Sequence, residues 1–297
     1  MVIPAHNEAQ VIGPLLDSLL AADGPGAEIP GDPEPLEIVV VCNGCTDGTA
    51  QVAAARGARV RVVEIPVPSK HEALRAGDAE VKSFPRLYVD ADVLLSPSDV
   101  RSLTQVLSDH SPAVLAVAPE RDIPLNGCGW PVRAYYRVWQ RLPEVRRGLF
   151  GRGVIAVTEA GHARLAALPP LMADDLAASL AFAPEERRVV PAARVRIQPP
   201  RTWRDLINRR VRAATSTAQL EQLEQLEQRT EAPSARTRPA DLFALLRADP
   251  ALLPGVLVFL AAAAVARRRA RQPIRSGDFG TWLRDESSRS RRDRLPN

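Results

Sequence analysis

Two aspartates separated by one residue, Asp90 and Asp92, follow the short apolar segment 86–89 (RLYV). In an extended chain residues i and i+2 point to the same side, so both carboxylates can face one ligand. Such hard oxygen donors suit Mg²⁺ or Mn²⁺, which binds a diphosphate and offsets charge on a departing phosphate. The alternative is a turn at a strand end, where the aspartates cap local backbone.

A second candidate is the turn 43–48 (NGCTDG), which follows the apolar run 36–42 (LEIVVVC). Open α/β sheets bind their ligands at the carboxyl ends of strands, which is where this turn is expected. Asn43 or Asp47 could accept a hydrogen bond from a base or a ribose. Thr46 or Asp47 could equally cap the helix that follows.

The chain has three cysteines, two of them close together as Cys42 and Cys45. Three are too few for a secreted disulfide scaffold. The spacing fits a redox pair or half of a zinc site. Because no second such pair is present and Cys128 is isolated, we favour two small residues beside a turn.

Adjacent carboxylates at Asp174 and Asp175 stand just before an expected apolar helix. They could supply a general base, because the charge of one raises the pKa of the other. They could also complement the dipole at the start of that helix. The arginines of segment 209–212 (RRVR) could contact a phosphate, although a solvated face is the favoured interpretation.

Strand and helix patterns alternate over the first 120 residues, with a loop at 21–35. This alternation predicts an α/β fold with a mainly parallel sheet that carries these residues at its edge. The expected strands cover residues 2–3, 36–42, 60–65, 86–89 and 113–118, and the expected helices cover 8–20, 49–56, 70–77 and 98–108.

In chain order, the segments VIPAHNE, CNGCTDGT, SKHEALRAG, VDAD, LFGRGVIAV, ADDLAASL and NRRVRAA resemble the family 2 glycosyltransferases of the GT-A fold. The resemblance covers about residues 1–215 and implies a GT-A glycosyltransferase domain there: a mainly parallel sheet flanked by helices, with a C-terminal helical extension. It implies metal-dependent transfer of a hexose, with inversion, from a nucleotide-diphosphate donor to an acceptor hydroxyl. The implied cofactor is Mg²⁺ or Mn²⁺.

The resemblance also implies roles for single residues. Asp175 matches the catalytic base, and Asp92, with Asp90 nearby, matches the ligand of the metal. Asn43 stands where the family usually has an aspartate that recognises the base. The other positions that match donor-binding residues are Pro4, Ala5, Glu8, Asp47, Lys70, Asp90, Asp174, Arg209 and Arg212.

Arg209, Arg210 and Arg212 lie where processive members carry a Gln/Arg-x-x-Arg-Trp motif. Here Ala213 takes the place of the tryptophan, which argues against processive synthesis.

Two other functions are compatible with the pattern. A sugar nucleotidyltransferase has a similar sheet, but usually carries a glycine-rich, basic loop after the first strand. Here the corresponding segment 5–10 (AHNEAQ) has no glycine and contains Glu8. A non-catalytic, membrane-associated protein that binds a nucleotide would also keep the fold.

The C-terminal third differs in charge from the rest. Residues 1–200 hold 20 basic and 24 acidic side chains, and residues 201–297 hold 19 basic and 11 acidic ones. The net charges are therefore −4 and +8, and the basic part suits an anionic surface such as phospholipid headgroups. Residues 201–229 look helical, and 231–239 read as a linker; we assign 216–250 to a helical segment and linker.

Residues 251–297 are expected to form an apolar helix and a basic tail. Segment 251–266 has 16 uncharged residues followed by RRRAR. Sixteen is short of the roughly 20 residues that span a bilayer, and Pro254-Gly255 interrupts the run. The arginines nevertheless suit a cytoplasmic membrane interface. The sequence is compatible both with a membrane-associated helix and with a buried helix that packs on the protein.

Composition limits the remaining classes. The chain has 297 residues, of which 45% are hydrophobic and 25% charged, so it can build a sizeable core and is not disordered throughout. Only 4% are aromatic, which argues against a nucleic-acid binder that stacks bases. The opening MVIPAHNE has no signal-peptide pattern. We expect a cytoplasmic protein, with the inner face of the cell membrane as a candidate location and a lipid-linked molecule as a candidate acceptor.

Overall fold

The computed structural model describes residues 1–21, 36–109, 113–169, 174–226 and 237–276. They form two compact units, which are described separately. The first unit consists of Met1–Ile123, Gly151–Leu168 and Phe182–Gln198, and the second of Pro124–Phe150, Pro169–Ala181 and Pro199–Asn297.

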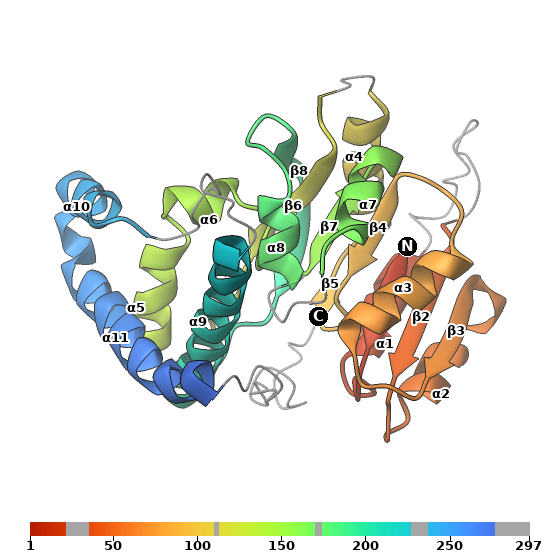
Figure 1. Cartoon of the computed structure of the whole chain (residues 1–297), viewed down its shortest axis with the longest axis horizontal. Helices are drawn as coiled ribbons and strands as arrows, with labels where there is room; N and C mark the ends of the chain where they lie inside the picture. The colour runs from red at the N-terminus through yellow and green to blue at the C-terminus, as the bar shows by residue number, and fades with distance from the viewer. Residues whose placement is uncertain (22–35, 110–112, 170–173, 227–236, 277–297) are drawn as a thin grey trace. The chain divides into compact units, whose positions relative to one another are not determined.

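The first unit is built on one sheet with the strand order β3-β2-β1-β4-β7-β6-β8-β5 (Figure 1). Its strands are β1 (Val2–Ala5), β2 (Ile38–Asn43), β3 (Val60–Ile65), β4 (Arg86–Val89), β5 (Val93–Leu94), β6 (Ala116–Asp122), β7 (Val154–Val157) and β8 (Arg187–Ile197). Its helices are α1 (Ile12–Leu20), α2 (Thr49–Ala54), η1 (Gly57–Arg59), α3 (Lys70–Glu80), α4 (Pro97–Ser108) and α7 (Glu159–Ala166).

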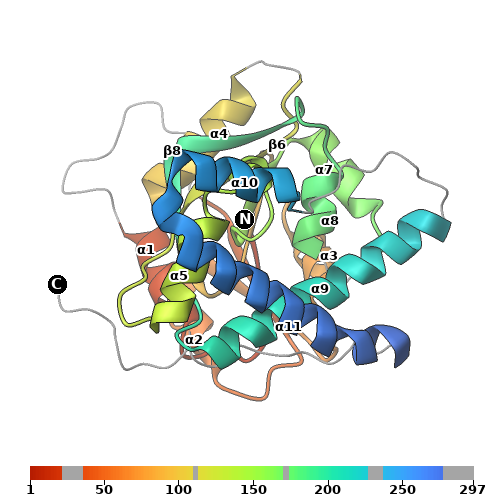
Figure 2. The ribbon, with the colours of Figure 1, turned by 90° about the vertical axis from the view of Figure 1, so that its left-hand side faces the viewer.

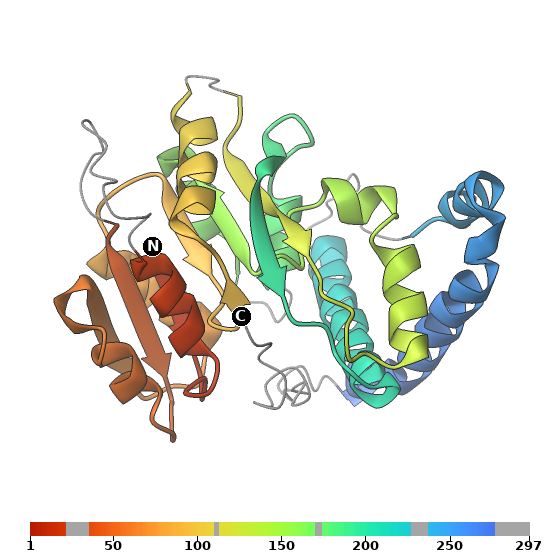
Figure 3. The same cartoon turned by 180° about the vertical axis from the view of Figure 1, so that it is seen from behind.

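The half of the sheet that contains β1 is parallel. β1 pairs in parallel with β2 and with β4, and β2 pairs in parallel with β3. Helices cover both faces here: α3 lies in front of the sheet in Figure 1, and α1 lies on the other face in Figure 3. Double coverage explains why β2 reads as an unbroken apolar run rather than an alternating one.

Successive residues of β1 and β2 supply two separate cores. Ile3 and Val40 pack with the apolar side of α1, whereas Val2 and Val41 pack with Ala73 of α3. Gly77 of α3 approaches the sheet so closely that a Cβ atom would lie 2.3 Å from a methyl group of Val2. The strands β1 and β2, which lead into polar turns, are therefore packed against helices on both faces of the sheet.

The other half of the sheet mixes directions. β7 pairs antiparallel with β4 and β6, β8 runs parallel to β6, and the short β5 pairs antiparallel with β8. The α/β class expected from the sequence is confirmed, and the sheet is mixed because the chain returns through β7 beside β4. The loop expected at 21–35 lies almost entirely outside the described residues.

The second unit is helical. It contains α5 (Trp130–Trp139), α6 (Pro143–Arg147), α8 (Asp174–Leu180), α9 (Trp203–Leu226), α10 (Pro239–Ala248), η2 (Pro250–Leu252) and α11 (Leu253–Ser276). Helix α11 packs on α5 and α9, as Figure 2 shows for α9. The helix expected over 201–229 is confirmed as far as Leu226, residues 231–236 of the expected linker lie outside the described part, and the division at 215 stays a prediction.

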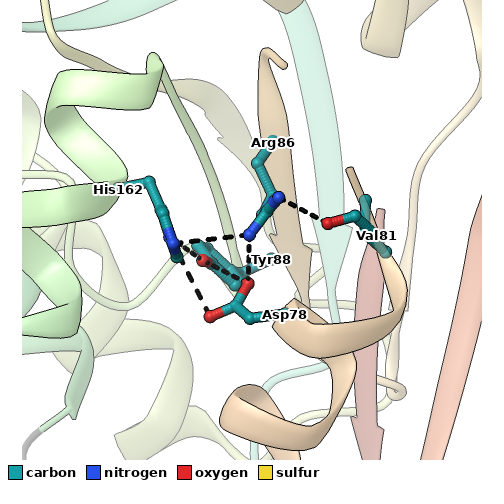
Figure 4. A network of polar contacts seen from close by, with 5 residues as sticks. All are labelled: Asp78, Val81, Arg86, Tyr88 and His162. Carbon is teal, nitrogen blue, oxygen red and sulfur yellow. Dashed lines mark hydrogen bonds and ion pairs between the residues drawn. The ribbon is translucent and has the colours of Figure 1, made fainter. Parts of the chain in front are cut away.

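A buried polar network joins α3, β4 and α7 in the first unit (Figure 4). The Arg86 guanidinium donates to the Asp78 carboxylate at 2.9 Å and to the Val81 carbonyl at 2.6 Å. The Tyr88 hydroxyl donates to Asp78 and lies 2.8 Å from Nδ1 of His162. Burial and the Asp78 charge raise the pKa of Tyr88 well above its ordinary value, so the phenol stays neutral.

The network yields the first prediction. Replacing Asp78 by alanine leaves the buried Arg86 charge without its carboxylate, so we expect a loss of about 3 kcal/mol in the free energy of unfolding, measured with urea. The matched control is Glu80→Ala, which removes the exposed ion pair with Arg61 and should cost less than about 1 kcal/mol. Equal losses in the two variants would show that Arg86 does not depend on Asp78.

Candidate functional site

The carboxyl ends of β1, β2 and β4 lie side by side at one edge of the first unit's sheet, because these neighbours are parallel. Ala5 is opposite Cys42 in the register, and Asn43 is the last residue of β2. Pro4 and Ala5 are buried in the strand itself. Three polar turns follow these strand ends, which places the sequence-predicted residues of this unit along one edge.

The turn after β1 is held to the turn after β2 by the side chain of Asn7. The backbone of Asn7 has a φ of 53°, a left-handed conformation that asparagine tolerates better than most residues. Its Oδ1 atom accepts from the backbone N–H of Thr46 at 2.7 Å. His6 adds a contact of 2.5 Å between Nδ1 and the Asn43 carbonyl. Sequence reasoning did not single out Asn7 or His6.

Glu8 is buried beside the same turn, and its N–H donates to the Thr49 hydroxyl at 2.8 Å. Its carbonyl accepts from the N–H groups of Val11 and Ile12, which starts α1. The helix expected from residue 8 therefore begins at Ile12, because the backbone of Glu8 is committed to the neighbouring turn.

Asp47 organises the turn after β2 from an exposed position. Its carboxylate accepts from the N–H and hydroxyl of Thr49 and from the N–H of Ala9 at 3.2 Å. Partial burial acts to raise the pKa of Asp47, but these hydrogen bonds outweigh it and hold the pKa below its ordinary value. The N-cap of α2 is Gly48, so neither Thr46 nor Asp47 takes the capping position weighed from the sequence; Asp47 instead accepts from the N–H of Thr49 at the start of the helix. Contact of Asp47 with a nucleotide stays a prediction.

Cys42 and Cys45 are both free thiols at the end of β2. The Cys45 thiol donates to the Ala5 carbonyl at 3.3 Å. Burial, reinforced by Cys45, raises the pKa of Cys42 to about 12, so this thiol stays protonated at neutral pH. This arrangement fits small residues that pack beside a turn better than a reactive thiolate.

Lys70 and Asp90 meet although they lie far apart in the sequence. Ser69 caps α3, which begins at Lys70, and the Lys70 ammonium donates to Oδ1 of Asp90 at 2.8 Å. The N–H of Asp90 donates to the Gly153 carbonyl at 2.7 Å. A Cβ atom at Gly153 would collide with Val93, so glycine permits this close approach. Asp92 follows in the same turn and is half-buried.

Arg152 is a buried charge beside this turn that sequence reasoning missed. Its side chain is fully buried and donates to the Pro119 carbonyl at 2.7 Å. Burial lowers the pKa of Arg152 to about 10, so the guanidinium remains charged at neutral pH. It ties β6 to the loop that carries Gly153. The one signal for it was an arginine between two glycines in LFGRGVIAV.

The remaining candidates belong to the second unit. Asp174 and Asp175 begin α8, which confirms the expected helix after them, and the Asp175 side chain is exposed. Arg209 and Arg212 lie in α9, and the Arg209 guanidinium donates to the Tyr136 hydroxyl at 3.3 Å. That they share one site with Asp92 stays a prediction.

The fold and its sheet edge define a glycosyltransferase of the GT-A type. Residues 1–165, more than half of the chain, match the family described as Glycosyl transferase family 2. The chain therefore belongs to the family 2 glycosyltransferases, as the order of its motifs indicated.

Solved structures that are similar to the chain are distant from it in sequence. The mannosyltransferase PcManGT from Pyrobaculum calidifontis, in complex with GDP-Man and Mn²⁺, is 22% identical with a TM-score of 0.58, covering 93% of this chain and 78% of its own. Glucosyl-3-phosphoglycerate synthase from Mycobacterium tuberculosis is 22% identical with a TM-score of 0.44, covering 67% and 69%. S. aureus TarS 1–349, in complex with UDP-GlcNAc, is 18% identical with a TM-score of 0.45, covering 66% and 57%. No curated protein matches the chain.

The hydrogen bonds of Asp47 yield the second prediction. Asp47→Ala removes the acceptor of these hydrogen bonds and should lower the free energy of unfolding by about 1 kcal/mol at pH 7. The folded-state pKa of Asp47 lies below its ordinary value of 3.8, so the ionic part of this stability is present above pH 4 and disappears as the pH falls through the folded pKa. The difference between variant and wild type in urea midpoint should therefore shrink towards pH 3.

The matched control is Glu185→Gln, which changes an exposed carboxylate elsewhere in the first unit. Its urea midpoint should follow that of the wild type at every pH. A difference between Asp47→Ala and wild type that stays constant down to the lowest pH would contradict the role of the Asp47 charge.

Proposed function

We propose that the protein is a metal-dependent, inverting glycosyltransferase that moves a hexose from a nucleotide-diphosphate donor to an acceptor hydroxyl. The observation that carries the proposal is the match of residues 1–165 to the glycosyltransferase family, in a chain whose polar turns share one sheet edge. The GDP-Man and Mn²⁺ bound by the mannosyltransferase of the same fold support a nucleotide-sugar donor and a divalent metal.

The nucleotide is proposed to bind along the ends of β1 and β2. Pro4 and Ala5 form the strand end, and Glu8, Asn43 and Asp47 lie in or beside the two turns. Because Asn7 and Thr49 already fix the backbone of these turns, little ordering is needed when a donor binds. Asn43 offers an amide where an aspartate is usual, so it can both accept from and donate to a base.

The proposed metal ligand is Asp92, with Asp90 nearby. Among the described residues no three His, Cys, Asp or Glu side chains cluster as a metal site. Mg²⁺ commonly takes one or two carboxylates and completes its shell with phosphates and water, so this donor set fits. Asp92 is proposed for direct contact because it matches the metal ligand of the family, and Lys70 holds Asp90 beside it. When bound, Mg²⁺ or Mn²⁺ would offset negative charge on the departing diphosphate.

Lys70 is proposed to serve the same diphosphate. Its ammonium is held by Asp90 at the edge of the sheet, where it remains partly exposed. An ion pair of this kind fixes the position of a flexible cation without removing its charge from the site. Arg209 and Arg212 of α9 are proposed as further cations for phosphate, and Tyr136 orients the first of them.

Asp175 is proposed as the general base. It would take the proton of the acceptor hydroxyl while the oxygen attacks the anomeric carbon on the face opposite the departing diphosphate, which inverts that centre. Asp174 precedes it at the start of α8. The acceptor is proposed to be lipid-linked and the location the inner face of the cell membrane, because the C-terminal third carries a net charge of +8.

The third prediction concerns turnover. With a panel of GDP-mannose, UDP-glucose and UDP-GlcNAc, release of nucleoside diphosphate should require Mn²⁺ or Mg²⁺ and stop with EDTA. Asp175→Asn should lower kcat by about 10²–10⁴-fold, the usual contribution of a general base, and Asp92→Ala should lower it at least as much. Glu185→Gln is the control and should keep full activity.

The outcomes separate the alternatives. Full activity in both variants would reject these roles. Pyrophosphate as product would indicate a nucleotidyltransferase, and binding without turnover would indicate a non-catalytic protein.

The fourth prediction separates binding from chemistry. A nucleoside diphosphate at about 100 times its Kd should stabilise the wild type by roughly 2.7 kcal/mol, visible as a rise in Tm. Asp175→Asn should keep this rise, because the base contacts the acceptor. Asp92→Ala should lose the part of the rise that depends on Mn²⁺. If Asp175→Asn loses the rise and Asp92→Ala keeps it, the two assignments are wrong.

A further inference from the structure

Helix α11 has one face that is packed inside the second unit. Small residues on this face, Gly255, Ala262 and Ala266, are buried, and Gly255 lies so near α5 that a Cβ atom would be 3.1 Å from the Ala134 carbonyl oxygen. Phe259 stacks on Tyr135 with 5.2 Å between ring centroids. This face therefore belongs to the core of the helical unit.

The opposite face of α11 is exposed and apolar at its start. Leu253, Leu257 and Leu260 are 51%, 59% and 47% exposed, values that are unusual for leucine in a folded unit. Their spacing of four and three residues places them on one side of a helix. Phe243 of the preceding α10 is 69% exposed.

The same stripe continues into arginines. At about 100° per residue, Arg268, Arg271 and Arg275 lie on the side of the helix that carries Leu253 and Leu257. All three are exposed, as are Arg267 and Arg269. Residues 250–276 contain no aspartate or glutamate, so this helix carries five positive charges and no negative one. Figure 2 shows α11 with α9 of the second unit.

Residues Pro250–Arg275 are long and apolar enough to cross a membrane by length and composition, and a third of the apolar window is buried in the structure. The packed face of α11 argues against a spanning arrangement, since α5 and α9 would have to follow it into the lipid. The uncharged part, 251–266, would also extend only about 24 Å, against about 30 Å of hydrocarbon.

We propose that the exposed stripe of α11, from Leu253 to Arg275, docks on the surface of an anionic phospholipid bilayer with the helix parallel to it. The leucines would enter the boundary between headgroups and acyl chains, while the arginines contact lipid phosphates. The exposed leucines match the apolar acyl layer of such a surface, and the arginines beside them match its layer of phosphates. The inference concerns a surface, and it does not depend on the proposed transfer reaction.

A second copy of the chain is the competing occupant. In a two-fold dimer the same stripe would face itself, which brings arginines of one copy against leucines or arginines of the other. Because the stripe contains no carboxylate, these charges would be desolvated without a partner. Phospholipid phosphates supply that partner, which is why the bilayer is favoured.

The test uses the full chain and vesicles, without donor or acceptor, so that its failure leaves the transfer reaction untouched. The protein should co-sediment with vesicles of phosphatidylcholine and phosphatidylserine, and much less with phosphatidylcholine alone. Raising the salt from about 0.1 M to 1 M shortens the Debye length from about 10 Å to 3 Å and should release it. This salt series needs no variant.

Two variants divide the stripe. Arg267→Gln, Arg268→Gln and Arg271→Gln together should lower the partition coefficient about a hundredfold, at roughly fivefold for each arginine. Leu257→Glu with Leu260→Glu should abolish binding at unchanged arginine content. Because the replaced side chains are exposed, both variants should keep the Tm of the wild type. The charge-matched control replaces three exposed arginines of the first unit by glutamine, Arg59, Arg75 and Arg188, and should bind like the wild type.

Three results would overturn the proposal. Wild-type protein that ignores both kinds of vesicle would exclude a membrane surface. An equal loss of vesicle binding in the stripe variants and in the control would show that binding depends on the net charge of the protein and not on the stripe. A dimer detected by light scattering, lost in Leu257→Glu with Leu260→Glu and accompanied by no vesicle binding, would assign the stripe to a second copy.

Discussion

Parallel pairing of β1 with β2 on one side and β4 on the other is the constraint on which the rest of the first unit depends. It forces three turns to leave the sheet at the same edge. It also buries both faces of the strands, which requires helices above and below and an apolar run such as 36–42. Polar side chains then gather at the strand ends, which is the edge where donor binding is proposed.

Hydrogen bonds that involve backbone N–H groups hold that edge in shape. The Asn7 side chain accepts from the N–H of Thr46, the Asp47 side chain accepts from that of Thr49, and Asp90 donates its own N–H to the Gly153 carbonyl. Each of these bonds fixes the backbone of one turn. The polar atoms of these turns that take no part in the bonds are the ones proposed to contact a ligand. The same contacts hold Asn7 in its left-handed conformation, because its side chain is bonded to the turn after β2 while its backbone forms the turn after β1.

The parallel half of the fold could be predicted from the sequence, and the return path could not. Strand 60–65 was predicted with the correct bounds, because a run rich in β-branched residues and bounded by turns is typical of a strand. β8 contains Pro191, and a register shift falls opposite it after Pro119, so the alternation at 193–196 does not extend over the whole strand. The same limit applies to the site: residue types identified Asp90 and Asp92, whereas the Lys70–Asp90 pair and buried Arg152 depend on contacts across the chain.

The apolar segment 251–266 shows why composition left two readings open. A membrane helix and a packed helix require the same apolar content, and α11 places part of that content on each of two faces. Gly255 and the buried alanines allow close approach to α5 and α9, and Phe259 packs on Tyr135, so these residues form the packed face. Leu253, Leu257 and Leu260 lie on the exposed face, in line with the arginines. Exposing these three leucines to water is unfavourable in free energy. Docking of the stripe on the proposed bilayer would remove this apolar surface from water.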